Sequence, residues 1–214
     1  MVFHIITIFP ESIKSYFDSS ILKRAQKNKK IKIKFYNPRD YTRGKHKTVD
    51  EKQFGGGPGM VMKVEPIIRA IQNTKYKTQN TKIIITSAAG RHFEQKMARE
   101  WAKKYKNIIL ISGHYEGIDE RVKKILKAQE ISIGSYVLTG GELPSAVITD
   151  AVSRQIPGVL GKKESLEENR GLGIPVYTRP EIFLYKDKKY KVPKVLLSGH
   201  HRKIEEWRKK NQKS

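Results

Sequence analysis

Three short stretches of the sequence combine glycines with polar or aromatic side chains, as ligand-binding loops do. The first, Phe54–Met60, reads FGGGPGM and places four glycines in five positions. Glycine permits backbone conformations that are closed to other residues, so this loop can approach a ligand closely or present N–H groups to a phosphate. It lacks the Gly-Lys-Ser/Thr ending of a Walker loop, and a mobile turn would explain it equally well.

The second stretch, Gly113–Arg121, reads GHYEGIDER and directly follows the apolar run Ile108–Ile111. The end of a strand that opens into a helix is where α/β proteins bind ligands. Two glycines here flank one aromatic side chain and one carboxylate, which would orient a flat ligand. An ordinary strand-to-helix turn with a capping acid is the alternative.

The third stretch, Ser132–Pro144, reads SIGSYVLTGGELP and leads from a short expected strand through a glycine pair into a helix begun by Pro144. Dense glycine beside apolar residues suits a pocket whose wall is main chain. Tyr136 and Glu142 add polar groups for which a simple turn has little need. Together, the second and third stretches could close one pocket of the size of adenosine.

These stretches are positioned by an alternation of short apolar runs and amphipathic segments. Continuous apolar runs indicate strands covered on both faces, and a 3.6-residue periodicity indicates helices. We expect strands over residues 3–8, 31–35, 83–86 and 108–112. We expect helices over residues 12–26, 65–72, 93–105 and 119–128. This rhythm predicts an α/β fold with a mostly parallel sheet.

The chain changes character after Gly161, where KKESLEENRGLGIP lacks apolar periodicity. Glycine, proline and mixed charge are typical of a linker. We therefore expect a domain over residues 1–161, a linker over 162–176 and a short C-terminal region over 177–214. In that region Ile204 and Trp207 lie three apart, which predicts a final helix with one apolar stripe.

The charge of the chain points to a phosphate polymer as partner. The 214 residues include 44 Lys and Arg against 21 Asp and Glu, a formal charge of +23. Such a field attracts nucleic acid, although a solvated lysine-rich surface gives the same balance. Candidate RNA surfaces are the basic tail over residues 202–213 and the basic run formed by Lys23, Arg24, Lys27, Lys29, Lys30, Lys32 and Lys34.

Composition also excludes several kinds of chemistry. The chain has no cysteine, so disulfides, thiolate nucleophiles and iron–sulfur clusters are excluded. The apolar N-terminal stretch is too short for a secretory signal, and no run is long enough to span a bilayer. We therefore expect a cytoplasmic protein without membrane contact.

Five blocks of sequence, in order and with matching spacing, resemble the bacterial tRNA (guanine-N1)-methyltransferase family, TrmD. They are FGGGPGM, GHYEGIDER, SIGSYVLTGGELP, SRQIPGVLG from Ser153 and YTRP from Tyr177. NPRDYT from Asn37 and VLLSG from Val195 also match, so the resemblance covers nearly the whole chain.

The resemblance implies a fold and a reaction that composition does not indicate. The fold is that of the SPOUT methyltransferases, with a trefoil knot in the C-terminal part of the catalytic domain, a feature that general folding rules would not predict. The reaction is methylation of N1 of the guanine 3′ to the tRNA anticodon, with S-adenosylmethionine as donor. The enzyme is a homodimer with active sites at the interface. Mg²⁺ is an optional second cofactor, yet the sequence shows no compact set of metal ligands.

The resemblance also assigns residues to the cofactor and to the substrate. Those at the cofactor are Ser87, in the turn after the third strand, and Gly113, Tyr115, Glu116, Gly117, Ile133, Gly134, Ser135, Tyr136, Val137, Leu138, Gly140 and Gly141. Those near the target guanine, contributed by the dimer partner, are His46, Asp50, Gly55, Gly56 and Gly59.

The catalytic residues include one departure from the family. Arg154 matches the arginine that stabilises negative charge at O6 of the guanine. The family's aspartate base is replaced by Asn169, and an amide cannot accept the proton as a carboxylate does. We expect Glu168 to serve instead, with Glu167 as the alternative.

The C-terminal region also looks abbreviated, so a catalytically weak RNA-binding protein that kept the cofactor fold is the competing hypothesis. A third hypothesis is a nucleotidase that binds phosphate through the FGGGPG loop. The sequence lacks the lysine and the acidic partner that such a site needs.

Overall fold

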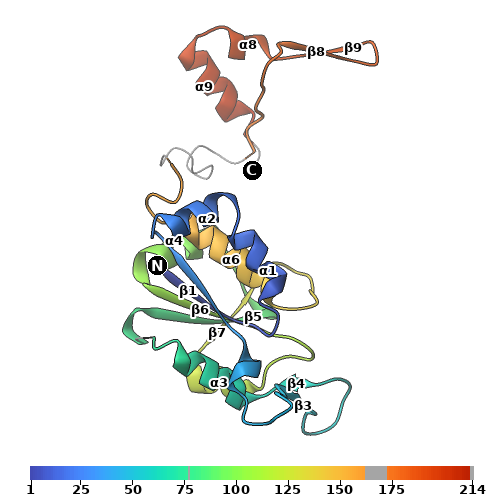
Figure 1. The fold of residues 1–214 in the computed structure, drawn as a ribbon. Helices are drawn as coiled ribbons and strands as arrows, with labels where there is room; N and C mark the ends of the chain where they lie inside the picture. Colours follow the sequence, from blue (N-terminus) through green and yellow to red (C-terminus); the bar gives the residue numbers. More distant parts are fainter. Residues whose placement is uncertain (77, 162–172, 213–214) are drawn as a thin grey trace. The chain divides into compact units, whose positions relative to one another are not determined.

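A computed structural model describes residues 1–76, 78–161 and 173–212 of the chain. The chain divides into two compact units, Met1–Gly161 and Lys162–Ser214. The first is built on a parallel sheet with helices, and the second contains a hairpin and two helices (Figure 1).

The first unit contains a five-stranded sheet whose paired strands all run parallel. Its strands are β1 (Val2–Ile6), β2 (Lys32–Tyr36), β5 (Thr81–His92), β6 (Asn107–Ser112) and β7 (Gln129–Ser132). They lie in the order β2-β1-β6-β5-β7. The α/β class and the mostly parallel sheet are thereby confirmed.

Helices cover both faces of this sheet (Figure 1). One face packs on α1 (Glu11–Phe17), α2 (Ser20–Lys27), α4 (Gln95–Lys104) and α6 (Glu142–Ser153). The other packs on α3 (Val64–Asn73) and α5 (Glu120–Leu126). Successive strand side chains point to opposite faces, so Ile5 joins the first core and its neighbour Ile6 the second. This explains why the central strands β1 and β6 are mostly apolar on both faces, whereas the edge strand β2 alternates lysines with apolar residues.

A second, smaller sheet carries the loop FGGGPG. Strands β3 (Asp50–Glu51) and β4 (Val61–Met62) pair antiparallel, and the loop joins them. Two short 3-10 helices, η1 (Pro38–Tyr41) and η2 (Thr78–Asn80), complete the described elements of this unit.

Three local expectations were wrong. The helix expected over residues 12–26 is two helices, because Ser19 and Ser20 leave helical geometry and the Ser19 hydroxyl donates to Tyr16 O at 2.8 Å. Serine competes with helix formation by bonding nearby backbone in this way. The third glycine-rich stretch holds no strand after Ser132, where β7 ends, and α6 begins at Glu142 rather than Pro144.

The second unit comprises the hairpin of β8 (Ile182–Tyr185) and β9 (Lys188–Lys191), followed by α8 (Lys194–Leu197) and α9 (His201–Lys210). The expected final helix is confirmed, and Ile204 and Trp207 are its less exposed side chains. Nowhere in the described ranges is a helix both long and apolar enough to cross a membrane.

We predict that Asp119→Ala lowers the free energy of unfolding by about 1 kcal/mol, because Asp119 caps α5 by accepting from Arg121 N at 2.9 Å. Hydrogen bonds from Arg121 also hold the pKa of Asp119 below its ordinary value of 3.8. Its contribution is therefore present above that pH and is lost as the pH falls through the folded-state value.

Urea unfolding at neutral pH measures the change. Asp119→Asn is the matched control, because its amide oxygen can still cap the helix. Equal stability of Asp119→Ala and the wild type would show that the cap contributes nothing.

Candidate active site

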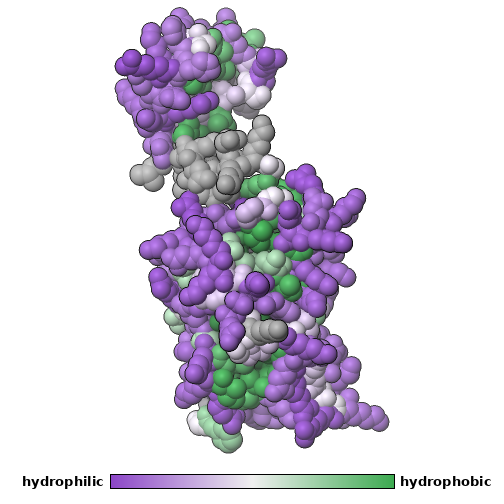
Figure 2. All heavy atoms as spheres, turned by 90° about the vertical axis from the view of Figure 1, so that its left-hand side faces the viewer, coloured by the Kyte–Doolittle hydropathy of each residue, from purple (hydrophilic) through white to green (hydrophobic). Residues whose placement is uncertain are grey.

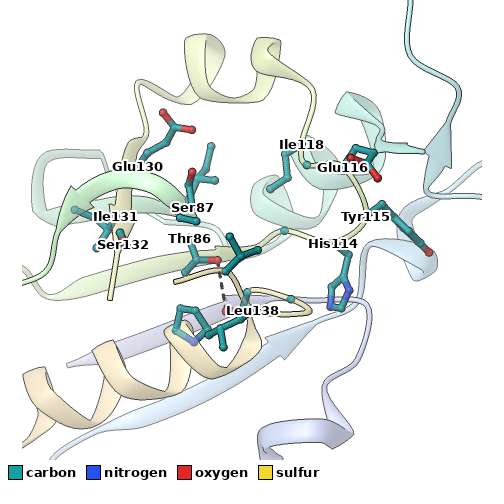
Figure 3. Close-up of a pocket in the computed structure, with 18 of the residues that line it drawn as sticks. Thr86, Ser87, His114, Tyr115, Glu116, Ile118, Glu130, Ile131, Ser132 and Leu138 are labelled. Atoms are coloured by element: carbon teal, nitrogen blue, oxygen red, sulfur yellow. Dashed lines mark hydrogen bonds between the residues drawn. The ribbon is translucent and has the colours of Figure 1, made fainter. Parts of the chain in front are cut away.

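A cavity of about 390 Å³ lies beside the middle of β5, where β6 and β7 end and the segments that follow them meet (Figure 3). The second and third glycine-rich stretches both line it, as expected from the sequence. Of the residues that the resemblance assigns to the cofactor, those on the cavity wall are Ser87, Gly113, Tyr115, Glu116, Gly117, Ile133, Tyr136, Val137, Leu138, Gly140 and Gly141. Gly134 and Ser135 belong to the same segment but not to the wall.

The cavity floor depends on a close approach of two main-chain segments. Gly141 N donates to Gly113 O at 2.9 Å, which joins the start of α6 to the end of β6. A Cβ atom at Gly141 would lie 2.7 Å from both Gly113 N and Ser112 Cα, and it would also collide with the Thr86 hydroxyl. No side chain fits there, so only glycine allows this contact.

A buried carboxylate ties the two cavity segments to the sheet. Glu142 is 6% exposed; one of its oxygens accepts from the Thr7 hydroxyl at 2.5 Å, and the other lies 2.7 Å from His114 Nε2. Thr7 follows β1, and His114 follows β6. The interpretation that a simple turn has little need for Glu142 was therefore wrong. The Glu142 carboxylate is buried, and a buried carboxylate requires hydrogen-bonding partners of this kind.

Sequence reasoning missed the roles of Thr7 and His114. A histidine two residues after the end of a strand was a usable signal for His114. Nothing local marks Thr7, which is 135 positions from Glu142 in the chain.

Ser87 reaches the cavity from inside a strand. It was expected in a turn, but β5 continues to His92 and bulges between Thr86 and Arg91, where its register against β7 shifts. A bulge redirects side chains locally. Ser87 and Ala88 thereby line the cavity wall.

The loop FGGGPG does not line the cavity, but its end contacts Glu116 on the cavity wall. Glu116 N donates to Met60 O at 3.0 Å, and a Cβ atom at Gly59 would lie 2.6 Å from the Glu116 side chain. Gly55 and Gly56 have no atom within 4 Å of such a position, and both have positive φ. His46 is exposed in the preceding segment.

Neither His46 nor Asp50 lines the cavity, and the same holds for Gly55, Gly56 and Gly59. The structure therefore does not bring these expected guanine contacts into the cavity of the same chain.

Arg154 stands at the end of α6, where its N–H donates to Asp150 O at 3.0 Å. The Asp150 carboxylate accepts from the Tyr16 hydroxyl at 2.6 Å, and this hydrogen bond raises the pKa of Tyr16 to about 12. Glu167, Glu168 and Asn169 lie outside the described residues. Within the described ranges, no group of three or more His, Asp or Glu side chains could hold a metal ion.

Comparison with known proteins places the chain in a family. The model of the family described as tRNA (Guanine-1)-methyltransferase TrmD matches residues 1–214. The chain belongs to the TrmD family. A relative from Dictyoglomus turgidum is 52% identical over 210 residues, which cover 96% of this chain and 82% of the relative. Relatives from Clostridioides difficile and Carboxydothermus hydrogenoformans are 48% and 50% identical, each over 98% of this chain and over 91% and 82% of their own lengths. All three bear the name tRNA (guanine-N(1)-)-methyltransferase.

We predict that Gly141→Ala, in this TrmD family member, costs about 1–3 kcal/mol of stability and abolishes binding in the cavity. The added methyl group must push apart main-chain atoms, and overpacking of this kind is typically that costly. Thermal unfolding and calorimetry with S-adenosylmethionine measure the two effects.

Gly161→Ala is the matched control, because nothing lies within 4 Å of its Cβ position. Wild-type stability and binding in Gly141→Ala would refute the close packing.

Proposed function

We propose that this protein transfers a methyl group from S-adenosylmethionine to N1 of the guanine 3′ to the tRNA anticodon. One observation carries the proposal: in a chain of the TrmD family, the two glycine-rich stretches converge on one cavity at the ends of parallel strands. Such ends are the usual ligand sites of α/β sheets. The relatives' names supply methyl transfer to guanine N1 of tRNA, and the donor and the position of the guanine come from the family resemblance.

The residues present fit an adenosine-containing donor. Main chain at Gly113, Gly140 and Gly141 leaves room for a flat ring, and backbone groups there can recognise its edge. Apolar Ile133, Leu138 and Val137 complete the wall. When bound, the donor supplies an electrophilic methyl group.

The side chains of the protein must manage charge and a proton on the guanine. N1 gains the methyl group and loses its proton, so a base must lie within hydrogen-bond reach of it. We assign that role to Glu168. Arg154 would stabilise the negative charge that develops at O6, for which its planar guanidinium is suited. No step is assigned to Mg²⁺, since the described residues offer it no cluster.

A homodimer would supply the parts that this cavity lacks. Leu143 and Val147, one helical turn apart on α6, are 58% and 46% exposed, and Tyr16, which donates to Asp150 on the same helix, is 47% exposed. Exposed apolar patches of this kind favour an interface. Arg154 lies two further turns along the same side of α6, so an interface there supports an active site shared by two chains. His46, Asp50 and the FGGGPG loop would come from the partner.

The SPOUT trefoil knot remains part of the proposal. The segment after β7 turns back to lie against the end of β6, where Gly141 packs on Gly113. This return supports the threading that the family implies.

The surface suits an RNA substrate. Hydrophilic side chains cover most of the face shown in Figure 2, and the basic run from Lys23 to Lys32 is exposed. Phosphate contacts could offset the cost of lifting the guanine from its stack, roughly a few kcal/mol. Lys32 and Lys34 also lie on edge strand β2, where lysines discourage strand pairing. A tRNA substrate would be consistent with a cytoplasmic enzyme.

We predict that the protein converts an unmodified tRNA transcript into one containing N1-methylguanosine, detected by mass spectrometry of nucleosides. A transcript with adenosine at the target position is the control. Arg154→Ala should lower the single-turnover rate by about 10²- to 10³-fold, and Glu168→Gln by about 10²- to 10⁴-fold, both with donor affinity unchanged.

If tRNA and donor bind but no methylated guanine forms, the protein is the catalytically weak RNA-binding protein considered above. If Glu168→Gln and Glu167→Gln both react at the wild-type rate, neither glutamate is the base.

We predict a dimer in solution, with twice the chain mass of 24.7 kDa by light scattering. Leu143→Lys with Val147→Lys should yield monomers that bind S-adenosylmethionine less well and do not methylate tRNA. Ile125→Lys is a control on an exposed apolar residue of α5. A fully active monomer would refute the shared site.

A further inference from the structure

The hairpin of β8 and β9 has an unusual surface for so small an element. All four residues of each strand are exposed. Within the second unit, the hairpin projects away from α8 and α9 (Figure 1). Apolar and aromatic side chains that cluster on an exposed surface mark a site where a binding partner would shield them from water.

The two faces of the hairpin differ in chemistry. Phe183 pairs with Tyr190, and Tyr185 pairs with Lys188, so these four side chains share one face. The three aromatic side chains there are 58%, 54% and 54% exposed, for Phe183, Tyr185 and Tyr190. The opposite face carries Ile182 and Leu184, opposite Lys191 and Lys189.

The hairpin is rich in lysine, and Lys188 shares the aromatic face. The ten residues Ile182–Lys191 contain four lysines and one acid, Asp187. Lys186 Nζ lies 5.5 Å from the centre of the Tyr185 ring. The wider stretch of residues 173–212 contains eleven Lys and Arg against four Asp and Glu. An apolar protein partner would bury the rings but would also desolvate these charges at a cost.

We propose that Phe183, Tyr185 and Tyr190 form a stacking platform for unpaired bases of the RNA substrate, with Lys186 and Lys188 binding adjacent phosphates. Aromatic side chains in a positively charged setting bind single-stranded nucleic acid in this manner. Phe183 and Tyr185 are two residues apart on a strand, about 7 Å, which leaves space for one base between their rings. That the RNA is tRNA rests on the proposed function.

The test measures tRNA binding by fluorescence anisotropy over a range of salt concentrations. Phe183→Ala with Tyr190→Ala should weaken binding about tenfold or more, because two stacking surfaces are lost. The dependence on salt should stay the same, because no phosphate contact is removed. Lys186→Ala with Lys188→Ala should instead flatten the plot of log affinity against log salt concentration, by the slope that about one to two phosphate contacts contribute.

Two controls separate stacking from damage to the hairpin. Ile182→Ala with Leu184→Ala alters the opposite face and should bind tRNA as the wild type does. Tyr190→Phe keeps the ring and should do the same. In the Phe183→Ala, Tyr190→Ala variant, KM for tRNA should rise while kcat stays unchanged.

Wild-type tRNA affinity in the Phe183→Ala, Tyr190→Ala variant would overturn the inference. A loss of dimer mass in that variant would also overturn it, because the face would then contact a second copy of the chain. These outcomes are independent of the proposed function: the wild type could methylate tRNA without using the hairpin. A wild type that binds tRNA through the hairpin but forms no N1-methylguanosine would refute only the proposed function.

Discussion

The packing of Gly141 on the end of β6 is the constraint on which the rest of the first unit depends. The hydrogen bond from Gly141 N to Gly113 O is possible only because no Cβ atom intervenes. It fixes where α6 starts, and so it brings Glu142 into the interior beside Thr7 and His114. Those two contacts in turn hold the segments after β1 and β6. The cavity lies between the segments that these contacts hold in place.

One helix links the proposed donor cavity to Arg154, the side chain proposed to act on the guanine. α6 begins at the cavity floor and ends at Ser153, and Arg154 follows it directly, twelve positions after Glu142. Its buried side packs on the sheet, while Leu143 and Val147 face outward. A second chain that covers that side would complete the site near Arg154. In the proposed dimer, one chain would hold the donor and its partner would present the guanine.

Much of the fold could be predicted from the sequence, because long continuous apolar runs define strands that helices cover on both faces. The break at Ser19 was missed, since the apolar periodicity runs through it. The bulge in β5 was missed because it depends on register against β7, which no local pattern records. The cavity wall was anticipated through glycines and family motifs. The partners of Glu142 were not, because Thr7 and Glu142 meet only through the folded topology. Glu168 stays a prediction, as it lies outside the described residues.

The central claim is that the cavity between the middle of β5 and the ends of β6 and β7 binds the methyl donor. Hydrogen exchange with and without S-adenosylmethionine tests it most directly. We expect slower exchange at the amides of residues 113–117 and 133–141, with no change in α2. Protection confined to the FGGGPG loop or to the second unit, with residues 113–117 and 133–141 unaffected, would contradict it.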